Sequence, residues 1–313
     1  MTMNSKQKSF MECIHPKNWL IVLGLLCTRI IVLLPFRIIV TIGQAMGLLL
    51  YRISSSRLQV ARKNIELCFP ALSATEQSNL VKQHFISLGM GVFEVGMARW
   101  KTNQSLRKII EIKGIEHLIR AVKKNRGVIL MSAHFTMLEI SALIGRNEIV
   151  QEDLPPMVGM FRLGKNSIIN QFFRNTRLRS TESLVTKFEV KDLIRALKDK
   201  KLVWYASDQS FTGKNAISVN FFKHPAMTNP GIIRIAKITG SPVLPYFPSR
   251  LANGKGYVLE VLPEIESFPS EDTNNDMKKI HALLEQHILQ NPEQYYWIHR
   301  RFKTVADDKN LYQ

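Results

Sequence analysis

Short apolar segments rich in β-branched residues alternate with helix-length segments over most of the chain after residue 115. The predicted strands are 127–133, 157–161, 202–206, 242–247 and 257–262. The predicted helices are 116–124, 137–146, 165–176, 190–198, 230–239 and 275–289. Strands that alternate with helices form a largely parallel sheet with helices on both faces. The sequence therefore predicts an α/β fold with a mostly parallel central sheet, with an exposed loop over 264–276.

Two apolar runs precede this region. The first, 19–36, contains the single charge of Arg29 and ends at Pro35, and about 18 such residues is the short end of a membrane span. The second, 38–50, contains Gly43 and Gly47 and is predicted to be an interfacial or packed helix. We therefore predict an N-terminal membrane anchor with a hydrophobic helix over 1–53 and an α/β domain over 54–313.

The form of this anchor stays open at the level of sequence. A single span and a monotopic helix both fit its length, and the alternative is a buried core hairpin of a soluble protein. Pro35-Phe36-Arg37 is not the small-residue cleavage site that a secretory signal peptide needs. More cations follow the first run than precede it, which predicts a cytoplasmic body. They are Arg37, Arg52, Arg57, Arg62 and Lys63 after it, against Lys6, Lys8 and Lys17 before it.

The net charge of +18 indicates an anionic partner or surface. Nucleic acid, anionic lipid and an acidic carrier protein are the candidates. The basic residues are scattered, and the sequence contains no zinc-finger spacing and no aromatic strand motif of the RNA-binding type. A membrane surface or an acidic protein is therefore favoured, and no nucleic-acid partner is predicted.

A long helix is predicted from Ser73 to about Trp100. Ser73 and Glu76 have the spacing of a capping box. Gly89, Gly91 and Gly96 are poor helix formers inside this segment. Their spacing is not that of a phosphate loop, so close packing against another helix explains them better.

The predicted strand 127–133 leads directly into His134, and Glu139 follows five residues later. In open α/β sheets ligands bind at the carboxyl ends of the strands, where His134 would lie. Five residues along one continuous helix would leave the two side chains about 140° apart. They can meet only if His134 lies in the turn before the helix. Glu139 would then fix one imidazole nitrogen and leave the other as a general base. The alternative is a cap-region histidine and an unrelated surface glutamate.

Polar residues also follow two other predicted strands. Arg162 ends the segment that begins at Gly159, and Asp208 follows Ala206. Arg162 offers a planar donor fork for a phosphate or an oxyanion, and otherwise is a solvated surface arginine. Asp208 would otherwise cap a helix or turn. A basic cluster near a helix end fits phosphate recognition or a solvated face; it consists of Arg174, Arg177 and Arg179.

Several chemistries are disfavoured by the motifs that the sequence lacks. It contains no G-x-S-x-G elbow, no H-E-x-x-H and no Walker A motif. Cys13, Cys27 and Cys68 have no metal-binding spacing and are expected to be unpaired thiols. The other histidines show no ligand spacing that would complete a metal site with His134 and Glu139. We therefore expect neither a metal nor a cofactor.

Several blocks of the sequence together resemble one enzyme family. His134-x-x-x-x-Glu139 looks like the first signature block of the glycerolipid and lysophospholipid acyltransferase superfamily, and 159–162 and 242–245 resemble two later blocks. Longer segments resemble, across nearly the whole chain, the late (secondary) acyltransferases of bacterial lipid A biosynthesis. These segments are 15–19, 61–70, 203–209 and 292–303. Glutamate in the first block and the His-Pro-x-x-Trp start look most like the lauroyl-transferring branch.

The resemblance implies an acyltransferase of the bacterial inner membrane with its catalytic body on the cytoplasmic face. It would move a fatty acyl group, lauroyl in this branch, from acyl carrier protein to a hydroxyl of the Kdo-bearing lipid A precursor (Kdo2-lipid IVA). The alternatives are a myristoyl or palmitoleoyl transferase of the same family, a lysophospholipid acyltransferase and a non-catalytic membrane adaptor. Acyl carrier protein, the precursor and inner-membrane lipids are the implied partners, and the two substrates are anionic.

The resemblance also implies roles for single residues. Glu139 would orient His134, and His134 would remove the proton of the acceptor hydroxyl. Backbone amides at the start of the following helix, with Arg162, would stabilise the oxyanion. Other residues are expected to bind substrate or its phosphates: Arg177, Arg179, Asp208, Lys223 and Thr228. Many superfamily members have Phe-Phe-Gly where this chain has Phe221-Phe222-Lys223, so Lys223 would supply charge there.

Overall fold

A seven-stranded sheet forms the centre of the computed structural model, which describes residues 15–186, 188–303 and 311–312. The strand order is β1-β9-β8-β2-β5-β3-β4, and all neighbours are parallel except β8 and β9. The strands are β1 (Ile110–Lys113), β2 (Val128–Ser132), β3 (Met157–Met160), β4 (Ser183–Val185), β5 (Leu202–Ala206), β8 (Val243–Arg250) and β9 (Tyr257–Val261). The predicted α/β fold is confirmed.

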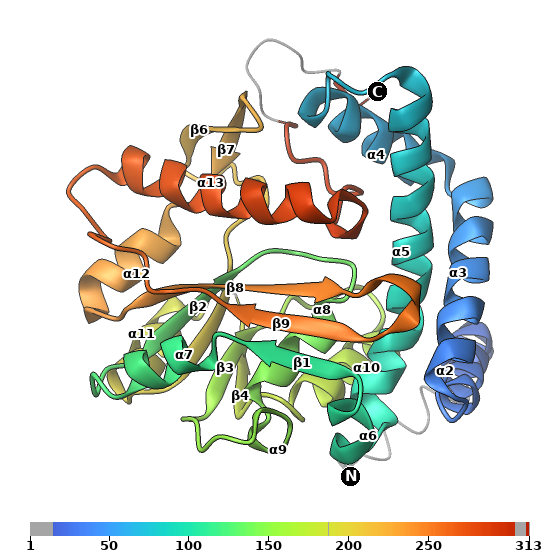
Figure 1. The fold of residues 1–313 in the computed structure, drawn as a ribbon, viewed down its shortest axis with the longest axis horizontal. Coiled ribbons are helices and arrows are strands. Elements are labelled where there is room, and N and C mark those ends of the chain that lie inside the picture. Colours follow the sequence, from blue (N-terminus) through green and yellow to red (C-terminus); the bar gives the residue numbers. More distant parts are fainter. Residues whose placement is uncertain (1–14, 187, 304–310, 313) are drawn as a thin grey trace.

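Helices cover the sheet on both sides, and Figure 1 shows α13 crossing one face while α9 and α10 lie on the other. The helices of this body are α4 (Ser55–Cys68), α6 (Asn103–Arg107), α7 (Ile115–Val122), α8 (Leu138–Ser141), α9 (Asn147–Val150), α10 (Ser167–Arg177), α11 (Val190–Lys198), α12 (Gly231–Thr239) and α13 (Thr273–Gln290). The 3₁₀ segments are η1 (Pro16–Asn18), η2 (Ala142–Gly145), η3 (Ala252–Gly254) and η4 (Pro292–Gln294).

The structure adds short elements that the sequence pattern did not predict. The edge strands β1 and β4 have four and three residues, too few to show a periodicity. A separate hairpin of β6 (Ile217–Phe221) and β7 (His224–Thr228) turns at Phe222 and Lys223 without a glycine. The predicted helix 137–146 is divided into α8 and η2. The predicted loop 264–276 ends earlier, because the Asp272 carboxylate caps the first turn of α13 through the amide of Asn275.

The apolar run 19–36 is not one continuous helix. It forms α2 (Trp19–Ile31), a turn, and the start of α3 (Phe36–Ile53). The break lies before Pro35, which has no amide to donate and restricts the residue before it. The 13 residues of α2 reach about 20 Å, short of the roughly 30 Å of a bilayer core. Among the described residues α3 alone is long and apolar enough to cross a membrane.

Glycines let α3 pack closely on α5 (Ala74–Trp100), as the sequence predicted for both helices. A Cβ on Gly89 would lie 2.1 Å from the amide nitrogen of Gly47 and 2.4 Å from the carbonyl oxygen of Gly43. A Cβ on Gly96 would lie 2.6 Å from Cγ2 of Thr28 on α2. The capping box of α5 is present as predicted. Figure 1 shows α3 along the outside of α5, at one edge of the molecule.

The sides of α2 and α3 that do not contact α5 carry exposed apolar side chains. Leu20 is 84% exposed and Leu33 is 78% exposed. The others are Trp19, Leu23, Leu26, Ile30, Leu34, Ile38, Leu49 and Ile53. The helix pair is therefore not the buried hairpin of a soluble core. An exposed apolar surface of this extent is typical of a membrane-binding element.

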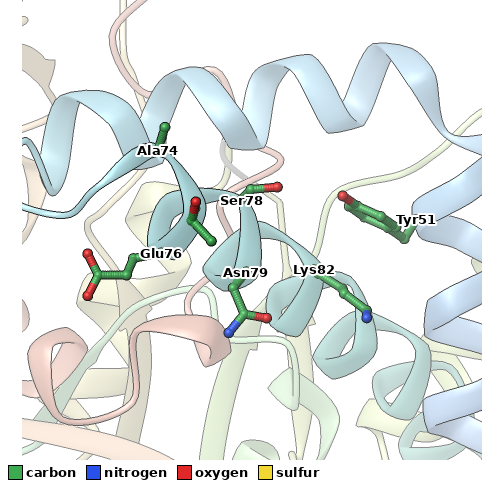
Figure 2. Close-up of a pocket in the computed structure, with 7 residues that line it drawn as sticks. Tyr51, Ala74, Glu76, Ser78, Asn79 and Lys82 are labelled. Atoms are coloured by element: carbon green, nitrogen blue, oxygen red, sulfur yellow. The ribbon is translucent and has the colours of Figure 1, made fainter.

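A surface hollow of about 550 Å³ lies between the end of α3 and the first turns of α5 (Figure 2). Tyr51 and Lys82 lie at one side of it and Glu76 at the other. Glu76 is engaged by Ser73 in the capping box. None of the residues that line the hollow lies at the end of a strand. The hollow is therefore separate from the edge of the sheet at which His134 lies.

Candidate active site

The register of two neighbouring strands brings His134 and Asp208 together. β2 and β5 are parallel and adjacent, with Ser132 paired with Ala206 at their carboxyl ends. His134 and Asp208 each follow two residues later, so both leave the sheet at the same place. His134 lies in the turn before α8, and Glu139 lies within α8, as the sequence predicted.

Asp208 holds His134 through both oxygens of its carboxylate. Oδ1 lies 2.8 Å from the imidazole Nδ1, and Oδ2 accepts the backbone amide of His134 at 3.1 Å. Asp208 is 3% exposed. Burial raises the pKa of this carboxyl, but the charge and hydrogen bonds of His134 outweigh burial and hold the pKa at about 2. An ionised Asp208 therefore accepts the Nδ1 proton and leaves Nε2 free to act as a base.

Glu139 does not contact His134, and this corrects the predicted pairing. Its carboxylate is bound by the guanidinium of Arg177, with Nη2 at 2.7 Å and Nε at 3.0 Å from Oε1. Arg177 also donates to the carbonyl of Met160 at 3.3 Å and lies over the ring of Phe161. The first turn of α8 aims Glu139 at α10, away from the loop that carries His134. In the structure the carboxylate that contacts the His134 imidazole is therefore that of Asp208.

The Glu139–Arg177 pair makes a prediction for stability. Glu139 is 4% exposed and Arg177 is 19% exposed at the side chain. Removing one partner of a buried pair leaves the other charge uncompensated, which costs about 3 kcal/mol. We expect Glu139→Ala to lower the free energy of unfolding by about this amount. Denaturant unfolding measures it, with Glu182→Ala as a control at a more exposed pair with Lys201. An equal loss in the two variants would contradict this role of Glu139.

His134 opens into a cleft of about 610 Å³ between the ends of β2, β3 and β5. Its polar lining includes Arg162, Arg177 and Gln209. Trp204 forms part of the wall, with its ring centroid 6.4 Å from that of His134. Apolar side chains supply much of the remaining surface, among them Leu138, Met160, Phe161, Ile169, Phe173 and Phe211. The cleft thus combines one base, two guanidinium groups and apolar walls.

A smaller cavity of about 30 Å³ continues the cleft under β3. The two share Leu138, Met160, Arg177 and Trp204 as lining residues. Beyond them the small cavity is bounded by Glu139, Ala142, Met157, Gly159, Thr181 and Leu184. The cavity therefore extends the cleft from His134 into the body of the domain, past the Glu139–Arg177 ion pair.

Two arginines of the predicted basic cluster lie outside the cleft. Arg179 donates to the carbonyls of Ala98 and Arg99 at the end of α5. Its guanidinium therefore closes the C-terminus of that helix, where unpaired carbonyls favour a cation. Arg174 is exposed on α10. Of the cluster, Arg177 alone lines the cleft.

Lys223 and Thr228 also lie outside the residues that line the cleft. Lys223 is exposed in the turn of the β6–β7 hairpin with φ +67°, the conformation that glycine adopts most easily. Thr228 is buried at the other end of β7, about 16 Å away along the strand. Its hydroxyl donates to the carbonyl of Ala226 and accepts from Arg301 at 2.8 Å. The structure therefore gives Thr228 an internal partner instead of a solvent-facing phosphate site.

A segment near the C-terminus, residues 292–301, holds the loop of His134 and had no predicted site role. The amide of Tyr296 donates to the carbonyl of His134 at 3.1 Å, and the amide of Thr136 donates to the carbonyl of Gln294 at 2.9 Å. The hydroxyl of Tyr295 donates to Oδ2 of Asp208 at 3.1 Å. The resemblance of 292–303 to the acyltransferase family was the one signal that pointed to this segment.

Comparison with known proteins identifies relatives along nearly the whole chain. The family model described as bacterial lipid A biosynthesis acyltransferase matches residues 6–304. The lipid A biosynthesis lauroyltransferase of Escherichia coli (strain K12) is 35% identical, over 93% of this chain and 94% of that protein. The palmitoleoyltransferase of the same strain is 34% identical, over 96% of this chain and 97% of that protein. The myristoyltransferase is 23% identical, over 93% of this chain and 88% of that protein.

Proposed function

We propose that this chain, which belongs to the bacterial lipid A biosynthesis acyltransferase family, transfers a fatty acyl group from acyl carrier protein to a hydroxyl of the Kdo-bearing lipid A precursor. The observation that carries the proposal is the His134–Asp208 pair at the mouth of an apolar cleft. That pair supplies a general base, and the cleft supplies room for an acyl chain. Lauroyl is the proposed acyl group, and a palmitoleoyl chain is the closest alternative.

The proposed reaction needs one base and an oxyanion donor. Asp208 holds the Nδ1 proton of His134, so that Nε2 takes the proton of the acceptor hydroxyl. The oxygen attacks the carbonyl carbon of the donor thioester, and a tetrahedral oxyanion forms. Arg162, which lines the cleft, stabilises that oxyanion. The carbon–sulfur bond then breaks, and the imidazolium returns its proton to the leaving thiolate.

Glu139 and Arg177 act in this proposal as a pair. Their ion pair fixes the wall of the cleft between α8 and α10. Glu139 therefore supports the site through Arg177 and not through His134. Lys223, Thr228 and Arg179 are assigned no direct contact with substrate, because other parts of the chain hold them or place them outside the cleft.

Charge and surface apolarity fit the proposed partners. Acyl carrier protein is acidic and the lipid A precursor is phosphorylated, so a net charge of +18 favours both encounters. The exposed apolar sides of α2 and α3 would anchor the body to the inner membrane, where the acceptor resides. The catalytic body is proposed to lie on the cytoplasmic face, where acyl carrier protein is available.

The proposal is tested by mass spectrometry of the lipid product. Purified full-length protein in detergent is supplied with lauroyl carrier protein and Kdo2-lipid IVA, and separately with a lysophospholipid acceptor. We expect a mass increase of one lauroyl group on the lipid A precursor alone. Acylation of the lysophospholipid instead would make the chain a phospholipid-type acyltransferase. No product with either acceptor would support the non-catalytic adaptor.

The small cavity under β3 makes a prediction for acyl chain length. A Cβ on Gly159 would lie 3.3 Å from both Leu184 and Thr181, so an added methyl crowds this cavity. Each methylene that loses its apolar surroundings costs about 0.8 kcal/mol, roughly a fourfold change in preference. We therefore expect Gly159→Ala to raise the ratio of shorter-chain to longer-chain product by about fourfold for each methylene of difference.

The measurement is mass spectrometry of products from a mixture of saturated acyl carrier donors. Gly24→Ala is the matched control, because a Cβ there meets nothing within 4 Å. An unchanged product distribution for Gly159→Ala would place the end of the acyl chain elsewhere.

A further inference from the structure

Arg301 is a buried arginine of the segment that also carries Tyr295, and it has no carboxylate partner among the described residues. Arg301 is 2% exposed and forms no ion pair with any carboxylate in the part of the chain that the structure describes. Nη1 donates to the carbonyl of Met227 at 3.0 Å, and Nη2 donates to Oγ1 of Thr228 at 2.8 Å. Its Nε has no hydrogen-bond partner among the described residues. A buried cation in this setting needs a compensating anion nearby.

The neutral groups around Arg301 cannot supply that charge. Nδ1 of His281 lies 2.7 Å from the carbonyl of Asn220 and therefore donates, so Nε2 accepts from Arg301 at 3.3 Å. Burial and the charge of Arg301 lower the pKa of His281 to about 4, and burial lowers that of His299 to about 4. Both imidazoles are neutral at pH 7.

Three further titratable groups near Arg301 are also neutral at pH 7. Burial raises the pKa of each of them above its ordinary value; they are Cys68, Tyr295 and Tyr312. Burial lowers the pKa of Arg301 itself, and the electrostatic effects of Tyr295 and Asp208 oppose that change. Of the groups whose electrostatic effect opposes the lowering of the Arg301 pKa, Asp208 is the one that is ionised at pH 7.

Tyr295 links the two buried charges. Its hydroxyl donates to Oδ2 of Asp208 at 3.1 Å. Its ring lies 6.0 Å from that of Phe221, and the guanidinium of Arg301 lies 5.2 Å above the same Phe221 ring. On the other side the Tyr295 ring lies 5.9 Å from that of Phe135, next to His134 in sequence. A continuous set of contacts therefore runs from Arg301 to the base.

We infer that Tyr295 and Arg301 are positioning residues for His134, Tyr295 by a hydrogen bond that fixes the Asp208 carboxylate and Arg301 by a buried positive charge that offsets the negative charge of that carboxylate. The inference rests on the proposed function and deepens it. Without either group, more of the negative charge of Asp208 acts on the imidazole, which then keeps its proton to a higher pH. The acid limb of the pH–rate profile should therefore move to higher pH in both variants.

The experiment is the pH dependence of kcat/KM for acyl transfer by the full chain in detergent. For Tyr295→Phe, which keeps the ring, we expect a loss of about tenfold and an acid limb higher by about one pH unit. Arg301→Met should move the limb in the same direction, and Arg301→Lys should restore it because the charge is kept. Tyr312→Phe is the control, since it removes the hydroxyl of a half-buried tyrosine that is bound to Asn64 and not to Asp208, and it should leave the limb in place.

The outcomes separate this inference from the proposed function. Absence of transfer by the wild-type chain overturns the proposed function. If the wild type is active and the acid limbs of Tyr295→Phe and Arg301→Met superimpose on that of the wild type, the positioning role alone is overturned. A limb that moves equally in Tyr312→Phe also overturns it, because the change would then be structural. If Arg301→Met does not fold, the acid limb of Tyr295→Phe, which conserves the shape of the side chain, tests the positioning role.

Discussion

Replacement of His134 by alanine should reduce kcat/KM for acyl transfer by about 10²–10⁴-fold, because the reaction loses its general base. The side chain lies in a loop, is partly exposed, and packs no core, so the fold should survive the change. Mass spectrometry of the lipid product gives the rate, and circular dichroism confirms the fold.

His117→Ala is the matched control for this variant. His117 lies on α7 with its side chain 24% exposed, close to the 27% of His134, and does not line the cleft. Its replacement should leave transfer within about threefold of wild type, the size of ordinary surface effects. Turnover by His134→Ala within tenfold of wild type would show that another group removes the proton.

Asp208→Asn should cost nearly as much, again about 10²–10⁴-fold, although the side chain keeps its shape. Oδ2 of Asp208 accepts two donors, the amide of His134 and the hydroxyl of Tyr295. The oxygen of asparagine would take that place and turn its NH₂ group toward Nδ1. The imidazole would then carry its proton on Nε2 and could not act as a base.

Glu139→Gln is the informative comparison for Asp208→Asn. It weakens the bond to Arg177 and leaves the contact between His134 and Asp208 intact. Its kcat/KM should therefore exceed that of Asp208→Asn by at least about tenfold, as expected when the imidazole keeps its orienting partner. Equal losses in the two variants would restore Glu139 as the orienting residue.

The edge of the sheet at which the site lies could be predicted from sequence, because strands and the polar residues after them follow a local pattern. His134, Arg162 and Asp208 each follow an apolar strand; in the structure His134 and Arg162 line the cleft, and Asp208 contacts His134. The partner of His134 could not be predicted in this way. It depends on the pairing of β2 with β5, whose residues are more than 70 positions apart. Glu139 was predicted because it is close in sequence.

The arginines show a second limit of local patterns. Arg177 and Arg179 are two positions apart, so about 200° separates their directions at the end of a helix. One binds Glu139 in the cleft and the other binds carbonyls of α5, and composition alone cannot separate them. Tyr295 and Arg301 lie outside any strand-end pattern. Both residues reach the site because the chain returns to it after α13. No local sequence signal predicts that return.

The break in the first apolar run has a simpler cause. The run 19–36 has the hydropathy of a span, but Pro35 ends the hydrogen-bonding ladder, and α3 begins directly after it. The position of this proline accounts for the helix pair. The packing of α3 on α5, in contrast, was predictable because glycines recur in both segments.

The protonation of the His134 imidazole tests the central claim most directly. Nitrogen-15 spectra of the histidine-labelled full chain at neutral pH report which ring nitrogen carries the proton, independently of any substrate. The structure predicts an Nδ1–H tautomer with free Nε2 in the wild type and in Glu139→Gln, and an Nε2–H tautomer in Asp208→Asn. An unchanged tautomer in Asp208→Asn together with a changed one in Glu139→Gln would contradict the account.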